Sequence, residues 1–310
     1  MRLGVLDVGS NTVHLLVVDA HRGGPPVAHA SHRSVLRLMR YLDPSGAITQ
    51  EGVDAVVAAV ASAADAAAHA GIDELLPFAT SALREASNGT EVLALVEAAT
   101  GVRLQVLTGD EEARITFLAV RRWFGWSAGE ILLLDIGGGS LELAAGGAED
   151  PDVAVSLPLG AGRSTIAFLP HDPPSTEQVA ALRAHARTLL TEARTRFVGR
   201  ADPAHVVGSS KTIRSLARLA GSVADGVGPQ DRRLLRRSAL EDWVPRLARI
   251  PADARPALPG ITPDRTFQIV AGGIVLAETM RAFGLDELEV SPWALREGLI
   301  LRYLERIAPA

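Results

Sequence analysis

The sequence repeats one ten-residue segment at a distance typical of domains. Residues Leu6–Leu15 align without a gap on Leu134–Leu143: two leucines, an aspartate and a glycine are identical, and three of the other six positions are conservative. Each copy has an apolar run that ends in an aspartate, a turn of small residues, and a second apolar run. This pattern is typical of a β-hairpin. A repeat at this distance indicates two homologous lobes rather than a short-period solenoid.

Strand-like and helix-like segments alternate around both copies, which favours an α/β layer architecture. We place the N-terminal lobe at residues 1–125 and the C-terminal lobe at 126–310, with the last helix, 293–307, free to pack back on the first lobe. The helices expected from periodicity and capping signals span residues 49–70, 88–99, 110–123, 175–197, 212–219, 232–249, 262–283 and 291–307.

Composition excludes several classes of protein. The chain has no cysteine, which excludes a disulfide scaffold, a thiolate nucleophile and cysteine-ligated zinc. A net charge of −5 over 310 residues gives no bulk attraction to nucleic acid. No uncharged apolar run approaches the roughly 18–20 residues of a membrane span, and Asp7 interrupts any signal-peptide core. We therefore expect a cytoplasmic protein that binds no membrane, DNA or RNA.

The two repeated turns have the chemistry of a phosphate site. A tight turn of glycine and small residues directs several backbone N–H groups to one point, and Ser10, Asn11 and Ser140 add side-chain donors. Asp7 and Asp135 precede the turns and would repel phosphate unless a cation lay between, which points to Mg²⁺ or Mn²⁺. Ordinary hairpin turns are the alternative. Two copies in register, each preceded by an acid, favour a phosphate cleft between two lobes.

Two other glycine patterns match known nucleotide motifs poorly. A strand follows Gly137–Gly139, whereas a dinucleotide fingerprint must open a helix. Gly208–Thr212 differs from a P-loop because Ser210 stands where glycine should precede Lys211. Backbone N–H groups at this helix start could still bind an anion; the alternative is a plain helix N-terminus.

Two charged residues outside the repeat are candidates for chemistry. Thr108 and Glu111 fit a capping box, which leaves Glu112 available as a general base or as a solvated first-turn acid. Arg84 follows a predicted strand and could bind phosphate oxygens or be a surface charge. Arginine stripes over 183–194 and 232–237 suit either a polyanion groove or a solvated helix face.

Together these segments resemble the exopolyphosphatase / guanosine pentaphosphate phosphatase family over essentially the whole chain. The resemblance implies an actin/hexokinase/Hsp70-like (ribonuclease H-like) α/β fold, with a five-stranded mixed sheet and flanking helices in each lobe. The matching segments, in the family's order, are Leu6–Asn11, Ala79–Ala86, Gly109–Arg114, Asp135–Glu142, Ser156–Gly160, Gly208–Leu219 and Arg296–Leu299.

The resemblance implies Mg²⁺-dependent hydrolysis of a terminal phosphoanhydride in a homodimer; a potassium requirement stays open. By position, Glu112 corresponds to the catalytic base, Asp135 and Glu142 to carboxylates that serve metal and water, and Asp7 to the first acidic residue, which we include among the metal ligands. The phosphate-binding candidates are Ser10, Asn11, Arg84, Gly137, Gly138, Gly139, Ser140, Ser209, Ser210, Lys211 and Thr212.

The chain departs from the family pattern in three ways. Lys211 stands where many members have glycine, His14 replaces a common arginine, and no additional C-terminal helical domain follows the second lobe. Lys211 could add a phosphate contact or block a nucleotide. The other two departures favour short polyphosphates over long ones.

The function expected is that of an exopolyphosphatase, with inorganic polyphosphate as the substrate. The nearest alternative is a guanosine pentaphosphate phosphohydrolase, which performs the same chemistry on another substrate. A kinase of the same fold and a non-enzymatic regulator that binds polyphosphate or nucleotide are the others. Glu112, Asp135 and Glu142 argue against the regulator.

Overall fold

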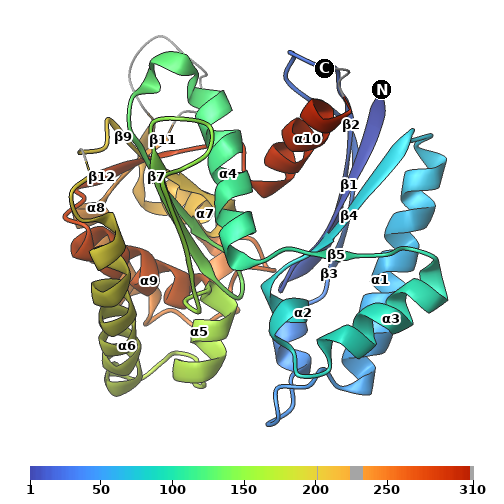
Figure 1. The fold of residues 1–310 in the computed structure, drawn as a ribbon. Helices are drawn as coiled ribbons and strands as arrows, with labels where there is room; N and C mark the ends of the chain where they lie inside the picture. The colour runs from blue at the N-terminus through green and yellow to red at the C-terminus, as the bar shows by residue number, and fades with distance from the viewer. Residues whose placement is uncertain (201, 224–232, 308–310) are drawn as a thin grey trace. The chain divides into compact units, whose positions relative to one another are not determined.

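The computed structural model describes residues 1–200, 202–223 and 233–307. The chain divides into two compact units: unit 1 is Met1–Ala119 with Leu295–Ala310, and unit 2 is Val120–Ala294. Relative to the lobes expected from the sequence, this division assigns residues 120–125 to unit 2 and the last helix to unit 1. Each unit is an α/β structure with one mixed sheet (Figure 1).

Unit 1 contains a five-stranded sheet in the order β3-β2-β1-β4-β5. The first three strands form an antiparallel meander, and β4 and β5 add in parallel. Its elements are β1 (Arg2–Val8), β2 (Thr12–Asp19), β3 (Val27–Val35), the 3₁₀ helix Leu38–Tyr41, α1 (Gln50–His69), β4 (Glu74–Ala79), α2 (Ser81–Glu85), α3 (Gly89–Thr100), β5 (Gln105–Val106), the start of α4 (Gly109–Phe124) and α10 (Leu295–Arg306).

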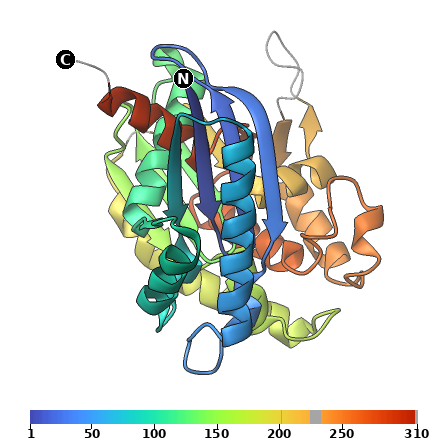
Figure 2. The ribbon, with the colours of Figure 1, turned by 90° about the vertical axis from the view of Figure 1, so that its right-hand side faces the viewer.

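Strand β1 is buried on both faces of the unit 1 sheet, and its side chains alternate between two cores. Leu6 and Val8 point into a core that they share with α1 and α3. Leu3 and Val5 point the other way, into a core that contains Leu299 and other residues of α10. Figure 2 shows α1 lying along the face of this sheet.

Helix α1 is long and apolar enough to cross a membrane by length and composition alone. Its buried residues recur at helical spacing, with Val53, Val56, Val60, Ala63 and Ala67 packed in the core of unit 1. This pattern is typical of a helix that covers a sheet. Thr49 caps the helix as expected, with its hydroxyl accepting the N–H of Gly52 at 3.4 Å.

Unit 2 contains a seven-stranded sheet in the order β10-β11-β12-β9-β6-β7-β8. The expectation of five strands is therefore wrong for this unit, because β10 and β11 form an antiparallel pair that adds to β12 and extends the sheet. Its elements are the end of α4, the 3₁₀ helix Trp126–Ala128, β6 (Ile131–Ile136), β7 (Leu141–Gly146), β8 (Val153–Leu157), α5 (Ala161–Phe168), α6 (Thr176–Arg194), the 3₁₀ helix Thr195–Phe197, β9 (His205–Ser209), α7 (Ser210–Ala220), β10 (Ser222–Val223), β11 (Arg233–Arg236), α8 (Arg237–Leu247), the 3₁₀ helix Arg255–Ala257, α9 (Ile269–Ala282) and β12 (Glu287–Val290).

Two predicted helices in unit 2 are partly wrong. The first was expected over 232–249, but Arg233–Arg236 forms β11 and the helix begins at Arg237; residue 232 lies outside the described residues. The second was expected from Thr262, but residues 263–268 form turns and α9 begins at Ile269. In the first case the pairing of β11 with β12, which is distant in the sequence, determines the backbone; in the second the Thr262–Pro263 start signal lies seven residues before the observed helix start.

The sequence repeat is a structural repeat. In unit 1 the register pairs Asp7 with His14, and in unit 2 it pairs Asp135 with Glu142. Both turns are closed by an equivalent hydrogen bond, from Gly9 N–H to Thr12 O at 3.0 Å and from Gly137 N–H to Ser140 O at 2.9 Å. The predicted pair of equivalent hairpins is therefore confirmed within each unit.

Candidate functional site

In unit 1 the predicted phosphate turn lies beside the residues that follow β4. Strands β1 and β4 are parallel, so their carboxyl ends meet at one edge of the sheet. The Ser10 and Ser81 hydroxyls are 3.1 Å apart and buried. Asp7 Oδ1 lies 3.7 Å from the point where a Cβ on Gly9 would stand, so the carboxylate is next to the turn. The structure thus brings Asp7, Ser10 and the start of α2 together.

The predicted base and the predicted phosphate arginine form an ion pair within unit 1. Arg84, in α2, donates from Nη1 to Glu112 Oε1 and to Leu107 O, the latter at 2.7 Å. Glu112 is 7% exposed, which excludes its interpretation as a solvated first-turn acid. The predicted capping box is confirmed, because Glu111 accepts the N–H of Thr108 at 2.8 Å and the Thr108 hydroxyl accepts the N–H of Glu111 at 3.2 Å.

In unit 2 the glycine turn is held by the first turn of α5. The carbonyls of Gly137 and Gly138 accept the N–H groups of Ala161 and Gly162, each at 2.9 Å, and Gly139 O accepts Gly160 N–H at 3.2 Å. In a trans peptide the C=O and N–H point in opposite directions. The N–H groups of Gly138, Gly139 and Ser140 therefore point away from α5. This is the donor arrangement of an anion-binding turn.

Asp135 and Glu142 form a carboxylate pair on adjacent strands. They are directly opposite in the antiparallel register, which places their side chains on one face of the sheet. Ser209 donates its hydroxyl hydrogen to Asp135, and Ser156 donates to Glu142 Oε1 at 2.9 Å. Like charges in this position are destabilising unless a cation compensates them.

This donor set suits a hard divalent cation. Mg²⁺ prefers carboxylate oxygens and keeps several waters or substrate phosphate oxygens, so two carboxylates with neighbouring hydroxyls fit it. Among the described residues no group of three or more His, Asp or Glu side chains could form a complete metal site by itself. Asp135 and Glu142 would be the two protein carboxylates on this face of the unit 2 sheet for such a cation.

The loop between β9 and α7 has the expected strand–turn–helix form. Ser209 is fully buried and is the residue before the first turn of α7. Ser210 has φ +76°, a conformation that costs a non-glycine residue about 1 kcal/mol or more and that clusters at functional sites. Lys211 and Thr212 follow in the first turn, with Lys211 half-buried and Thr212 buried. The structure places Ser209 against Asp135, so this loop lies beside the carboxylate pair of unit 2.

Gly160 and Ser156 are site residues that residue chemistry alone missed. A Cβ on Gly160 would lie 2.2 Å from the carbonyl carbon of Gly139 and 2.3 Å from Ser140 N, so only glycine permits α5 to hold the turn. The segment Ser156–Gly160 matches the family, but its residue types alone indicate no role. The one sequence signal for a close contact is the glycine at position 160, directly before the short helix α5.

The two arginine stripes have structural partners. Arg183 and Arg187 of α6 bind the buried carboxylate of Glu278, and Arg236 and Arg237 pair with Glu287 and Asp286. For these four arginines the pairs favour packed and solvated surfaces over a polyanion groove, although Arg236 lies in a strand and not in the predicted helix.

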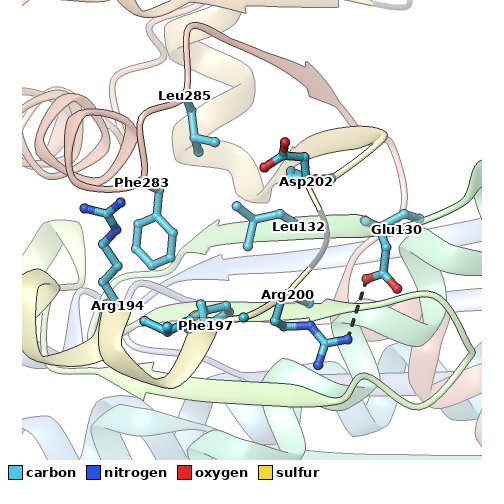
Figure 3. A pocket seen from close by; sticks show the side chains of 13 residues that line it. Glu130, Leu132, Arg194, Phe197, Arg200, Asp202, Phe283 and Leu285 are labelled. Carbon is cyan, nitrogen blue, oxygen red and sulfur yellow. Dashed lines mark ion pairs between the residues drawn. The ribbon is translucent and has the colours of Figure 1, made fainter.

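A cavity of about 350 Å³ lies at the other end of β6 from the glycine turn (Figure 3). Arg194 of the first stripe and the ion pair between Arg200 and Glu130 line it, together with Phe197 and Phe283. None of the predicted site residues is among its lining residues.

The chain is similar to known proteins over nearly its whole length. The model of the Ppx/GppA phosphatase family matches residues 16–307. "Exopolyphosphatase 1" of Mycobacterium leprae (strain TN) is 52% identical over 305 residues, which covers 98% of this chain and 90% of that protein. "Exopolyphosphatase 1" of Mycobacterium tuberculosis (strain H37Rv) is 51% identical, covering 98% of this chain and 89% of that protein.

Solved structures have the same fold. A Ppx/GppA family member from Aquifex aeolicus superposes with a TM-score of 0.80 at 25% identity, covering 100% of this chain and 99% of the other. An exopolyphosphatase from Cytophaga hutchinsonii has a TM-score of 0.85 at 22% identity, covering 99% of both chains. The expected actin-like α/β fold class is confirmed.

Proposed function

Because the chain belongs to the Ppx/GppA phosphatase family, we propose that its substrate is inorganic polyphosphate. The chain is an exopolyphosphatase, which hydrolyses the terminal phosphoanhydride of inorganic polyphosphate and releases orthophosphate. The observation that carries this conclusion is the near-full-length similarity to proteins named exopolyphosphatase. Within unit 2 the glycine turn offers N–H donors for phosphate, and within unit 1 the buried Glu112 offers a carboxylate for proton transfer.

Glu112 is proposed as the general base. Its carboxylate accepts a proton from a water molecule, whose oxygen forms a bond to the terminal phosphorus as the bridging P–O bond breaks. The shortened polyphosphate leaves with the electrons of that bond. Arg84 fixes the orientation of Glu112 through their ion pair, and its remaining N–H groups suit a phosphate oxygen.

The unit 2 turn is proposed to bind the phosphate oxygens on which negative charge is concentrated. N–H groups that are already oriented lower the barrier without reorganisation during the reaction, and phosphoryl transfer depends mainly on positioning and charge stabilisation. Asp135 and Glu142, with Asp7, would hold Mg²⁺ or Mn²⁺, which when bound neutralises charge on the phosphate oxygens. Ser10, Asn11 and Lys211 are proposed as further phosphate contacts.

The chain is further proposed to prefer short polyphosphates and to act as a homodimer in the cytoplasm. Faster turnover per chain end on long polyphosphates than on short ones would contradict the length preference. Sedimentation analysis of the purified chain tests the dimer.

The decisive experiment compares substrates. Purified protein with Mg²⁺ is given tripolyphosphate, longer polyphosphates and guanosine pentaphosphate, and released orthophosphate is measured for each. We expect kcat/KM for polyphosphate to exceed that for guanosine pentaphosphate. The reverse order would identify a guanosine pentaphosphate phosphohydrolase, and no release from any substrate with either Mg²⁺ or Mn²⁺ would favour a binding regulator.

A further inference from the structure

The cavity near the start of β6 is formed by unit 2 alone, since every residue that lines it belongs to that unit. Its volume is about 350 Å³, which lies within the range of about 300–1,000 Å³ typical of small-molecule sites. The lining comes from the start of β6, from β7, from residues 194–200 and 202–203, and from the loop after α9. A small molecule in this cavity would therefore contact none of the residues proposed for phosphate release.

Apolar side chains form much of the cavity wall. Leu132 and Leu285 are buried, whereas Phe197 and Phe283 are half-buried and face one another. The two ring centroids are 5.2 Å apart and the rings are inclined at 84°, which is the edge-to-face arrangement that aromatic rings prefer. A further aromatic ring packs favourably against such a pair. The apolar wall therefore favours a ligand with an aromatic body.

Two charged side chains of the lining have no partner in the protein. No hydrogen bond or ion pair within the described part of the chain engages the guanidinium of Arg194, the last residue of α6, or the carboxylate of Asp202. Arg194 differs in this respect from Arg183 and Arg187 of the same helix, which bind a carboxylate. Figure 3 shows Arg194 and Asp202 on opposite sides, with the apolar side chains between them.

The charges of the lining favour a single anionic group on the ligand. Arg194 can donate charge-assisted hydrogen bonds to a carboxylate. The other charged lining residues are the ion-paired Arg200 and Glu130, whose Nη2 and Oε2 atoms are 3.7 Å apart, and Asp202. Two positive and two negative side chains balance, so the cavity has no excess positive charge to attract a polyanion. A polyphosphate chain also has no apolar part to cover the phenylalanine rings.

We propose that this cavity is a binding site for a small aromatic monocarboxylate. The aromatic body packs against Phe197 and Phe283, and the carboxylate accepts hydrogen bonds from Arg194. The site goes beyond the proposed function, because its ligand is neither the substrate nor the product of phosphate release.

The test titrates the full chain with indole-3-acetate, an aromatic monocarboxylate, in a calorimeter. Indole-3-acetamide is the matched probe, because it keeps the ring and replaces the carboxylate with a neutral amide. We expect saturable binding of one indole-3-acetate per chain and about tenfold weaker binding of the amide, since hydrogen bonds to a charged group are stronger than neutral ones. Tripolyphosphate should not displace indole-3-acetate.

Two arginine variants locate the site. Arg194 and Arg196 are both exposed near the end of α6, but only Arg194 lines the cavity. Arg194→Gln should raise the Kd for indole-3-acetate about tenfold and leave that for the amide unchanged, whereas Arg196→Gln should change neither. Phe283→Leu removes one ring and should weaken the binding of both probes. The Tm of each variant without ligand shows whether it folds.

The site is assigned wrongly if the unchanged protein binds no indole-3-acetate, if Arg194→Gln and Arg196→Gln bind it equally well, or if tripolyphosphate displaces it. These readouts are independent of phosphate release, so a failure of the proposed function would leave the test of the cavity intact.

Discussion

Glu111 and Glu112 are adjacent in the first turn of α4, but their carboxylates have different partners. Glu111 accepts the N–H and the hydroxyl hydrogen of Thr108, whereas Glu112 is paired with Arg84. We expect Glu112→Gln to lower phosphate release at least about 100-fold, because an amide cannot accept the proton of the attacking water. Polyphosphate binding, measured by equilibrium titration, should remain.

The matched control is Glu111→Gln. Glutamine also serves in a capping box, so this variant should keep its activity and stability while losing the same charge from the same helix turn. Equal losses of phosphate release in the two variants would attribute the effect to the charge of the turn and contradict the role of Glu112 as base.

Substitution of Gly160 tests whether phosphate release depends on the shape of the Gly137–Ser140 turn. A methyl group at this position would overlap Gly139 and Ser140, so Gly160→Ala must displace either α5 or the turn. We expect the variant to lose about 2 kcal/mol of folding stability through overpacking and most of its phosphate release. In the control Gly147→Ala, the new methyl meets only the mobile end of Glu130 at 3.0 Å.

Denaturant unfolding and phosphate release, measured on both variants, decide whether the site requires glycine at position 160. If Gly160→Ala unfolds at the same denaturant concentration as Gly147→Ala and releases phosphate at the same rate, the close approach of α5 is not required for the site.

At the scale of elements, helices α6 and α9 are joined by one buried carboxylate. Glu278 in α9 is 1% exposed and binds Arg183 and Arg187 of α6 and Arg281 of its own helix. Burial raises the pKa of Glu278, but the hydrogen bonds from Arg187 and Arg183 and the charges of Arg281 and Arg183 outweigh it, so the pKa lies below its usual value.

The lowered pKa of Glu278 predicts a pH dependence of stability. A carboxyl with a depressed folded-state pKa stabilises the fold fully above its unfolded pKa, and this contribution is lost as the pH falls through the folded-state pKa, below about pH 4. Glu278→Gln should cost about 2 kcal/mol at pH 7 and flatten this acid limb. Urea unfolding between pH 7 and pH 3 measures both; parallel curves for the two proteins would contradict the assignment.

The sequence predicted an element correctly where interactions between residues close in the sequence determine its structure. The capping boxes at Thr108 and Ser175 depend on residues three positions apart, and both are present. The edge strands of unit 2 were missed because Arg233–Arg236 gains its strand form from pairing with Glu287–Glu289. The contact of Gly162 with Gln268 joins segments that no local pattern relates.

At the scale of the whole molecule, two units with the same hairpin differ at the position opposite the aspartate. Unit 2 places Glu142 opposite Asp135, and unit 1 places His14 opposite Asp7. Two opposed carboxylates offer two anionic oxygen ligands on one face of the sheet, whereas an aspartate opposite a histidine offers one. The repeat therefore predicts that the units contribute unequally to metal binding.

Titration of Mg²⁺ into single variants, with phosphate release as the readout, measures how much each carboxylate contributes to metal binding. Asp135→Asn and Glu142→Gln should each raise the Mg²⁺ concentration for half-maximal phosphate release about tenfold, because each removes a ligand charge from the pair. Asp7→Asn should raise it less, and chelation with EDTA should abolish the activity of every active variant until Mg²⁺ is restored. If Asp7→Asn raises the Mg²⁺ requirement as much as Asp135→Asn does, the metal depends equally on both units, and the opposed carboxylates of unit 2 do not determine where it binds.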